Sequence, residues 1–392
     1  MGDSYDVVVV GARCAGAPLA AHLARAGRSV AVVDRAEFPS DAPCAHILGA
    51  EGASCLGRLG VLDRVLATGA PWLEREDLRI ESVRAVATVP LRPAGAGPGL
   101  CVRRRVLDKI LVEEARRAGA AVFTSTRVVG LLADRAGRVG GVAAVSGGRE
   151  RELGASLVVG ADGTGSTVAR LVGARRYGFA PNQRFWHCRY FEGAAWSSPA
   201  TLVYHRWGRR LVIAAPGDAG LCMVAIAPPL DRLAELRADP EALWAGEVAG
   251  CEPVRDLLAT ARPVGRPRTI ATFPSFFREA AGRGWALVGD AGHCPEPAGG
   301  QGISLALRHA ERLAHLIAAG PTTDAATRAW RRWRDADTAE VHAFSAALGA
   351  AGPFPEIAPA ALGQEIGRRP APSSASDEVE PSRAGPAEAG PR

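Results

Sequence analysis

Three glycine-rich loops carry the backbone and side chains best suited to hold phosphate and hydroxyl groups. They read GARCAG at residues 11–16, GADGTGSTVAR at residues 160–170 and GDAGHCPEPAGGQGIS at residues 289–304. Each loop follows an apolar run, and glycines, which lack a Cβ, let the backbone approach a ligand closely. Each loop alone could be an ordinary turn, so the elements around it must indicate what it does.

The elements around the first loop predict a βαβ unit. Residues 5–10 are a nearly unbroken apolar run typical of a buried strand, and residues 14–26 form a helix pattern with Leu19 and Leu23 on one face. Residues 29–34 follow as a second strand that ends on an acid. A strand, a tight glycine turn, a helix and an acid about twenty residues further on make up the dinucleotide-binding fingerprint.

This unit would bind a pyrophosphate at the start of its helix. Gly11 permits the sharp turn, Gly16 lets helix and strand pack closely, and free N–H groups at the helix start would hold the phosphates. Asp34 would accept hydrogen bonds from the adenosine ribose. Arg13 stands where the fingerprint has a second glycine, although its backbone could still face the phosphate. The residues expected to bind the dinucleotide here are Gly11, Arg13, Ala15, Gly16, Asp34 and Arg35.

Composition excludes several classes of protein. A chain of 392 residues with a net charge of +6 predicts two or three domains, and its scattered arginines indicate a solvated surface and no nucleic-acid module. The eight cysteines form no CxxC pair, so neither a metal site nor a disulfide framework is expected. No apolar run is long enough to span a bilayer, and the first strand leaves no room for a signal peptide. We therefore expect a cytoplasmic protein.

Taken together, the order and spacing of the three loops resemble the flavoprotein monooxygenase superfamily with the p-hydroxybenzoate-hydroxylase-like fold, which has geranylgeranyl-reductase-like members. The resemblance runs from the N-terminus to about residue 350 and implies a bound FAD. It implies that Asp290 hydrogen-bonds the flavin ribityl chain and that Gly299, Gly300 and Gly302 let backbone approach the isoalloxazine ring. N–H groups at the start of the following helix would stabilise negative charge on the reduced flavin.

The same resemblance assigns further residues to the cofactor. Arg104 would reach it from the start of a helix, Val128 would touch the adenine, and Asp162 would belong to a DG pair linked to both FAD and pyridine nucleotide. Ser304 and His309 depart from the Asn and Asp that are commoner in the family. The contacts implied for the third loop are Asp290, Gly300, Gln301, Gly302 and Ile303.

The fold class expected is α/β, with a Rossmann-type FAD-binding domain of the glutathione-reductase type, an inserted β-rich substrate domain and a C-terminal helical segment. Alternating patterns such as TLVYHRW and RRLVIAA predict the antiparallel strands of the substrate domain, whose aromatic residues suit an apolar ligand. The end of the chain has the composition of a disordered tail. The expected bounds are 1–71, 98–172 and 282–350 for the FAD-binding domain with its C-terminal helices, 72–97 and 173–281 for the substrate domain, and 363–392 for the tail.

The reaction expected from the resemblance is monooxygenation, by hydroxylation or epoxidation, of a hydrophobic aromatic or polyketide-like metabolite in bacterial specialised metabolism. NAD(P)H, binding transiently, and O2 would be the co-substrates. One alternative is a flavin-dependent reductase, dehydrogenase or oxidase of carbon–carbon bonds, and another is an FAD-holding scaffold that binds or cyclises a ligand without redox turnover. Halogenases of this fold depend on a lysine beside a tunnel. Halogenation is not expected here, because the only lysine, Lys109, falls within a helix expected at the surface.

Cys44 and His46, in the loop FPSDAPCAHILG, are the candidate catalytic residues. Cys44 partly matches a P-C-G stretch of geranylgeranyl-reductase-like members, with Ala45 in place of the glycine. His46 could act as acid or base, since the ordinary histidine pKa suits neutral pH. A packing cysteine and a loop histidine are the alternatives. Structural roles are expected for His187, His205 and His293.

Overall fold

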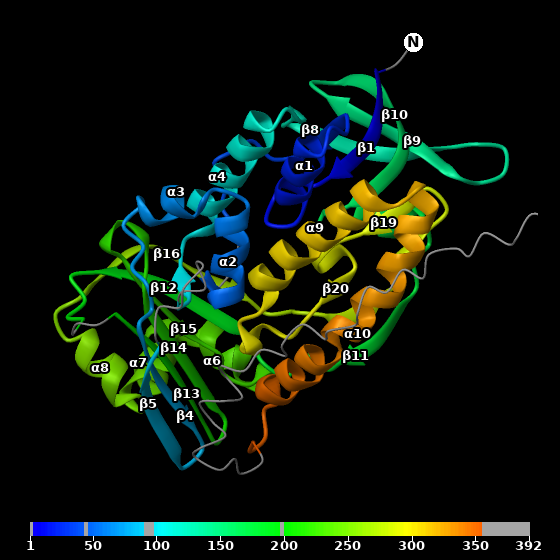
Figure 1. Ribbon diagram of the computed structural model, residues 1–392. Coiled ribbons are helices and arrows are strands. Elements are labelled where there is room, and N and C mark those ends of the chain that lie inside the picture. Colours follow the sequence, from blue (N-terminus) through cyan, green and yellow to red (C-terminus); the bar gives the residue numbers. More distant parts are fainter. Residues whose placement is uncertain (1–2, 43–45, 90–97, 197–199, 355–392) are drawn as a thin grey trace, which may run out of the picture.

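An eight-stranded sheet occupies the upper part of the molecule in Figure 1. The computed structural model describes residues 3–42, 46–89, 98–196 and 200–354. Strands β19, β10, β1, β2 and β7 run parallel in that order, and β8 and β9 continue from β10 as antiparallel partners. The strands are β1 (Asp3–Val10), β2 (Val30–Val33), β7 (Ala121–Phe123), β8 (Thr126–Ala133), β9 (Val139–Ser146), β10 (Arg149–Gly160), β18 (Ala281–Gly282) and β19 (Trp285–Leu287).

Both faces of this sheet are covered, which explains the unbroken apolar runs of its strands. Val7 and Val9 of β1 pack into one core, and Val8 and Val10 pack into another. The first core lies against helices α1, α4 and α9, and the second reaches β8, β9 and α5. These helices are α1 (Gly16–Arg25), α4 (Arg104–Arg117), α5 (Thr167–Leu171) and α9 (Gly302–Ala319), and the shorter α2 (Ala50–Arg58) and α3 (Leu62–Leu66) also contribute to the first core.

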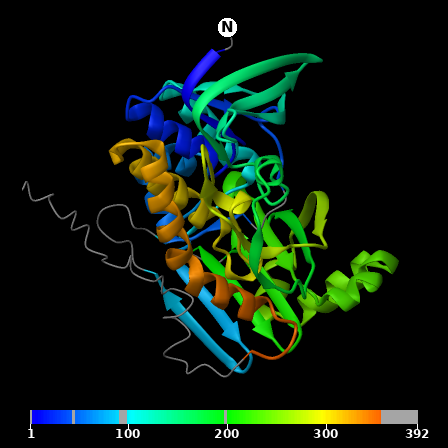
Figure 2. The ribbon, with the colours of Figure 1, turned by 90° about the vertical axis from the view of Figure 1, so that its right-hand side faces the viewer.

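A seven-stranded sheet forms the other half and occupies the lower part of the molecule in Figure 2. One face packs against helices α7 and α8 through Trp244 and Val254, and the opposite face carries Trp186 and Tyr204. In order across the sheet the strands are β16 (Arg262–Ile270), β12 (Trp186–Glu192), β15 (Cys222–Ile226), β14 (Arg210–Pro216), β13 (Thr201–Trp207), β4 (Arg75–Ile80) and β5 (Val83–Thr88). The helices beside it are α6 (Leu233–Ala238), α7 (Pro240–Ala249) and α8 (Glu252–Leu257).

The long helix α10 (Thr323–Gly349) connects the two halves and ends against the seven-stranded sheet (Figure 1). Two fully buried arginines hold its last carbonyl groups. Arg184 donates to the carbonyl oxygens of Gly349 and Ala350 at 3.1 and 2.8 Å. Arg206 donates to those of Leu348, Ala350 and Gly352 at 3.0, 3.0 and 2.7 Å. The expectation that arginine lies at a solvated surface is therefore wrong for these two residues. Backbone carbonyls accept from both guanidinium groups inside the protein, and Arg206 also pairs with Glu81 at 2.6 Å.

The α/β class, with a parallel sheet covered by helices, a β-rich sheet and C-terminal helices, is confirmed. Two small ladders complete the fold, one of β11 (Arg176–Ala180), β17 (Ser275–Arg278) and β20 (His293–Cys294), the other of β3 (Ile47–Leu48) and β6 (Leu100–Cys101). No helix in the described ranges is long and apolar enough to cross a membrane. The predicted tail, residues 363–392, lies outside the described residues.

Candidate functional site

The first glycine loop is shaped by contacts that leave no room for a side chain. Gly11 has a φ of +104°, and a Cβ there would lie 2.4 Å from the carbonyl oxygen of Ala161. A Cβ on Gly16 would lie 1.8 Å from the carbonyl oxygen of Gly11. Helix α1 begins at Gly16 with no side-chain cap from Ala15. The Ala17 N–H donates to the Arg13 carbonyl at 3.1 Å and Pro18 has no N–H, so the Gly16 N–H is the group of this first turn that is suited to an anion.

Asp34, at the end of β2, braces the same loop. Its Oδ2 accepts a hydrogen bond from the Ala12 backbone N–H at 2.7 Å, and its Oδ1 accepts one from Ala36 at 2.8 Å. Since a carboxylate offers about four lone-pair directions, each oxygen can also accept from a ribose hydroxyl. Arg35, its neighbour, is exposed.

Asp108 joins Arg13 and Arg104 beneath the loop, a role that the sequence analysis missed. Its carboxylate is fully buried and accepts from Arg13 Nη1 at 2.9 Å and from Arg104 Nε at 3.0 Å. Cys14 Sγ lies 3.3 Å from the same carboxylate. The available signal was an acid on an otherwise apolar helix face, four residues after Arg104. This shared acid fixes two guanidinium groups beside the expected pyrophosphate position.

The third loop presents a carboxylate that no protein group satisfies within the described ranges. Asp290 lies in the turn after β19 and makes no hydrogen bond there. Burial raises the pKa of Asp290 to about 6, and the charge of Arg104 acts in the opposite direction. Its side chain is only partly covered by protein atoms, so a ligand could reach it. A hydroxyl-bearing ligand would supply the missing donors.

The glycines after Asp290 do not all have the same function. Gly300 has a φ of +65°, and a Cβ on Gly300 or Gly302 would meet no atom within 4 Å. Helix α9 starts at Gly302 without a side-chain cap from Gln301, and Ile303 lies in its buried first turn. Gly299 differs, because a Cβ there would lie 2.1 Å from Ser345 Oγ on α10. The close approach of α10, and not of a ligand, accounts for this glycine.

The two departures from the family pattern have partners within the fold. Ser304 Oγ accepts from the backbone N–H of Gly49 at 3.2 Å, which ties α9 to the start of α2. His309 is buried, with its Nε2 3.6 Å from Asp337 of α10. An acid from the next helix therefore lies beside His309, where the family more often has an acid on α9 itself.

The middle loop is built around Asp162. Its Oδ1 accepts from Ser166 Oγ and its Oδ2 from the backbone N–H of Thr167, at 2.5 and 2.6 Å. Asp162 thus closes the start of α5, and a contact with FAD through it stays a prediction. Val128, on β8, is buried, and its contact with the adenine is likewise a prediction.

His46 sits beside the loops in a strained conformation, with a φ of +59°. Its Nδ1 accepts from the backbone N–H of Arg104 at 3.1 Å, so the neutral ring carries its proton on Nε2. Burial and neighbouring arginines lower the pKa of His46 to about 3. At neutral pH it is therefore a hydrogen-bond donor and a weak base. Cys44 lies outside the described residues.

The other histidines have structural partners, as expected. His187 Nδ1 lies 2.9 Å from Thr269 Oγ1, and His205 Nε2 lies 2.9 Å from Asp77. His293 Nε2 lies 3.1 Å from His342 Nδ1, and its ring stacks on Phe277 at 4.3 Å. In the described ranges, no group of three or more His, Cys, Asp or Glu side chains could hold a metal ion.

An apolar surface of the seven-stranded sheet faces the third loop. Trp186, Tyr204 and Met223 share one buried cluster with Ala298 of that loop. Within it, the buried hydroxyl of Tyr204 has no hydrogen-bond partner among the described residues. Burial raises the pKa of Glu296, on the same loop, to about 7. The third loop therefore packs against an apolar, water-poor face of the sheet.

Replacing Glu296 with glutamine should flatten the pH dependence of stability. A carboxyl whose pKa rises on folding stabilises the protein most below its unfolded pKa, near 4.5, and this stabilisation is lost as pH rises through 7. The wild type should lose about 2 kcal/mol more than Glu296→Gln between pH 5.5 and 8. Urea unfolding across that range measures this, with Glu150→Gln, at an exposed position on β10, as control. Parallel curves for Glu296→Gln and wild type would exclude this role for Glu296.

The site as a whole fits FAD. Two uncapped helix starts, at Gly16 and Gly302, are suited to phosphate and to a flavin that gains charge on reduction. Asp34 can hold a ribose, and Asp290 needs donors of the kind that a ribityl chain carries. The start of α1 at Gly16, Asp34 and Asp290 follow the parallel strands β1, β2 and β19, respectively. They therefore meet at the carboxyl ends of these strands, where ligands bind in open α/β sheets.

Comparison with known proteins agrees with this fit. A family model described as FAD binding domain matches residues 4–226, more than half of the chain. The menaquinone reductase of Mycolicibacterium smegmatis is 29% identical over 83% of this chain and 79% of its own. The digeranylgeranylglycerophospholipid reductase 1 of Methanococcoides burtonii is 27% identical over 85% of this chain and 80% of its own.

Solved structures share the fold at lower identity. The myxobacterial chondrochloren halogenase is 21% identical, with a TM-score of 0.78, over 87% of this chain and 82% of its own. Aklavinone-11 hydroxylase, solved with FAD and aklavinone, is 22% identical, with a TM-score of 0.72, over 91% of this chain and 70% of its own. At these identities the likeness shows a common fold.

Proposed function

This chain belongs to the FAD binding domain family and is an FAD-dependent oxidoreductase, and on that premise we propose that it is a monooxygenase. It would hydroxylate or epoxidise a hydrophobic, aromatic or polyketide-like metabolite with NAD(P)H and O2. Bound FAD would supply the redox chemistry. The chain's own residues would bind the cofactor, orient the substrate and exclude water.

The apolar face of the seven-stranded sheet beside the third loop carries this proposal. Trp186 and Tyr204 are 5% and 6% exposed, so the region between this sheet and the third loop already excludes water. Excluding water is what a monooxygenase must do to couple oxygen to its substrate. Because its pKa is lowered to about 3, His46 would remain neutral at neutral pH and would not transfer a proton there.

The cofactor would be held by groups that are already positioned. Asp34 would accept from the adenosine ribose, and α1 with Arg13 would bind the pyrophosphate. Asp290 would accept from the ribityl hydroxyls, and the start of α9 would face the isoalloxazine ring. The other contacts proposed are Ala15 and Arg35, from the dinucleotide fingerprint, and Arg104, Val128, Asp162, Gln301 and Ile303, from the resemblance.

Reduction of a carbon–carbon double bond is the second candidate, favoured by the two curated relatives named as reductases. Halogenation is not proposed. The single lysine, Lys109, lies on α4 with 54% of its side chain exposed and pairs with Glu113 at 3.7 Å. A surface lysine cannot serve a buried halogenating site.

Stopped-flow spectroscopy with two probes separates the candidates. FAD-loaded protein is mixed with NADPH or NADH, in the presence of aklavinone or a short-chain menaquinone, first without oxygen and then in air containing ¹⁸O2. Product carrying one ¹⁸O atom supports the monooxygenase. A reduced product formed anaerobically supports the reductase instead. Bound flavin that no donor reduces with either probe would contradict both and favour the scaffold alternative.

A further inference from the structure

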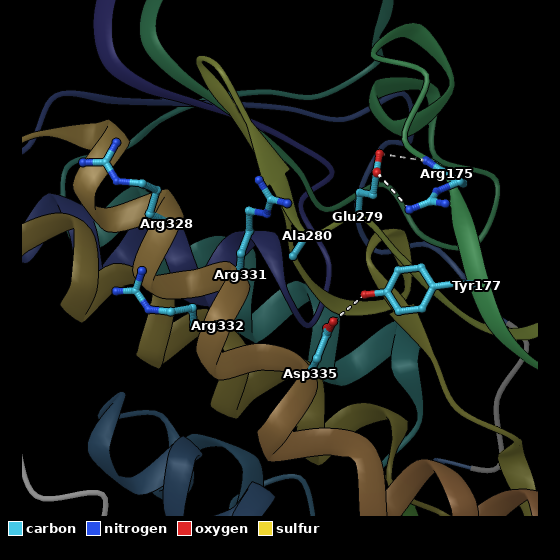
Figure 3. A pocket seen from close by; sticks show the side chains of 8 residues that line it. All are labelled: Arg175, Tyr177, Glu279, Ala280, Arg328, Arg331, Arg332 and Asp335. Atoms are coloured by element: carbon cyan, nitrogen blue, oxygen red, sulfur yellow. Dashed lines mark hydrogen bonds and ion pairs between the residues drawn. The ribbon is translucent and has the colours of Figure 1, made fainter.

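A separate hollow of about 440 Å³ lies between α10 and the ladder containing β11 and β17 (Figure 3). Figure 3 shows three arginines projecting from α10, with Arg175, Tyr177 and Glu279 on the other side. None of the lining residues belongs to the three glycine loops, so this hollow is distinct from the FAD site. The lining residues are Arg175, Tyr177, Glu279, Ala280, Arg328, Arg331, Arg332 and Asp335.

The three arginines of α10 share one side of the helix. Arg331 and Arg332 follow Arg328 by three and four residues, which are the spacings that bring side chains together on a helix. All three are exposed, and none makes an ion pair or side-chain hydrogen bond within the described ranges. Like charges at these spacings repel one another, so the helix gains nothing from them unless an anion binds.

The acids near these arginines already have other partners. Asp324, four residues before Arg328, accepts from Arg138 Nη1 at 2.7 and 2.8 Å. Asp335 accepts from Tyr177 Oη at 2.5 Å and from Arg334 Nε at 2.6 Å. These bonds leave the three guanidinium groups of Arg328, Arg331 and Arg332 as the uncompensated charge of the hollow.

Glu279, the acid on the opposite wall of the hollow, also has a partner already. Its carboxylate accepts from the Arg175 backbone N–H at 3.2 Å and pairs with the Arg175 guanidinium at 3.7 Å. The wall formed by Tyr177 and Asp335 is also fixed, because Arg334 beneath it is buried and donates to the carbonyl oxygen of Gly292 at 2.7 Å. Arg331 is directed towards this preformed wall, whereas Arg328 and Arg332 extend from α10 on the side away from it (Figure 3).

We propose that this hollow binds a phosphate-bearing ligand through Arg328, Arg331 and Arg332. A guanidinium is planar and presents paired N–H donors that match phosphate oxygens. Because the three side chains are exposed and unpaired among the described residues, they can rotate to bring their guanidinium groups around one dianionic group. The volume is sufficient for a pyrophosphate or a phospholipid headgroup. A soluble pyrophosphate and a phospholipid headgroup present the same phosphate oxygens to the arginines. This site is independent of which reaction the flavin performs.

The test uses FAD-loaded protein, so that the dinucleotide site cannot take up the probe. Inorganic pyrophosphate is titrated calorimetrically at low ionic strength, and cosedimentation is measured with phosphatidylglycerol and with phosphatidylcholine vesicles. Arg331→Ala/Arg332→Ala should weaken binding about tenfold, because it removes two charge-assisted contacts. Arg127→Ala/Arg149→Ala, which removes the same charge from two exposed strand positions, should leave binding unchanged. Arg331→Lys/Arg332→Lys should lie between the two.

A soluble phosphate ligand and a lipid headgroup predict different results in these two assays. Saturable pyrophosphate binding that only the α10 variants weaken supports the proposal with a soluble ligand. Binding confined to phosphatidylglycerol vesicles, weakened by the same variants alone, supports it with a lipid headgroup. Absence of both, or equal weakening in the α10 and strand variants, would overturn it.

Discussion

Asp290→Asn protein is expected to fold normally and to lose most of its FAD. The carboxylate of Asp290 has no hydrogen-bond donor among the described residues, and burial raises its pKa to about 6. In the FAD-free protein the negative charge of Asp290 therefore destabilises the fold at neutral pH. Ribityl hydroxyls would satisfy that charge. Asparagine removes it, and the loss of hydrogen bonds to a charged acceptor should weaken FAD binding about 100-fold.

The same substitution should stabilise the FAD-free protein. Because the folded pKa of Asp290 is raised, its contribution to stability is full below about pH 4 and is lost as pH rises through 6. At pH 7 the asparagine variant avoids this loss and should unfold with a free energy about 3 kcal/mol higher, and the difference should nearly vanish near pH 4.

FAD titration by fluorescence and urea unfolding of the FAD-free protein measure the two effects separately. Asp63→Asn, at an exposed position on α3, serves as the matched control and should change neither quantity. Weaker FAD binding together with lower stability of the FAD-free variant would mean that Asp290 is a structural residue. Unchanged FAD retention would refute its assignment to the cofactor.

The loops and the class of fold could be predicted because their causes are local in sequence. Gly11 needs a left-handed conformation beside a strand, and Asp34 ends the next strand where the dinucleotide fingerprint requires an acid. The buried valines of β1 likewise predict a strand that is covered on both faces. Each of these features can be recognised within about thirty residues.

The parts that could not be predicted depend on tertiary contacts. Asp108 becomes the centre of an ion-pair network only when α4 packs beside the first loop, and His309 meets Asp337 only when α9 lies against α10. Arginine composition was also misleading. Arg184 and Arg334 are buried because distant carbonyls surround them, whereas Arg331 of the same helix as Arg334 is exposed. Charge patterning alone cannot separate these cases.

Asp108→Ala should destabilise the protein by about 3 kcal/mol, because removing one member of a buried ion-pair network leaves the others unsatisfied. Arg13 and Arg104 keep only 28% and 14% of their side-chain surface exposed, so water can compensate them in part. Asp108→Asn should cost less stability, since the amide oxygen can still accept one of the hydrogen bonds.

Both Asp108 variants should also bind FAD more weakly, because Arg13 and Arg104 lose the anchor that holds them beside the pyrophosphate position. Urea unfolding of the FAD-free proteins and FAD titration at two salt concentrations provide the measurement. Glu113→Gln is the matched control, since Glu113 lies on the same helix and pairs with Arg64 and Lys109 at the surface. It should shift stability by less than about 1 kcal/mol and leave FAD binding intact. If Asp108→Ala behaved like this control, Asp108 would not be the anchor that positions the two arginines.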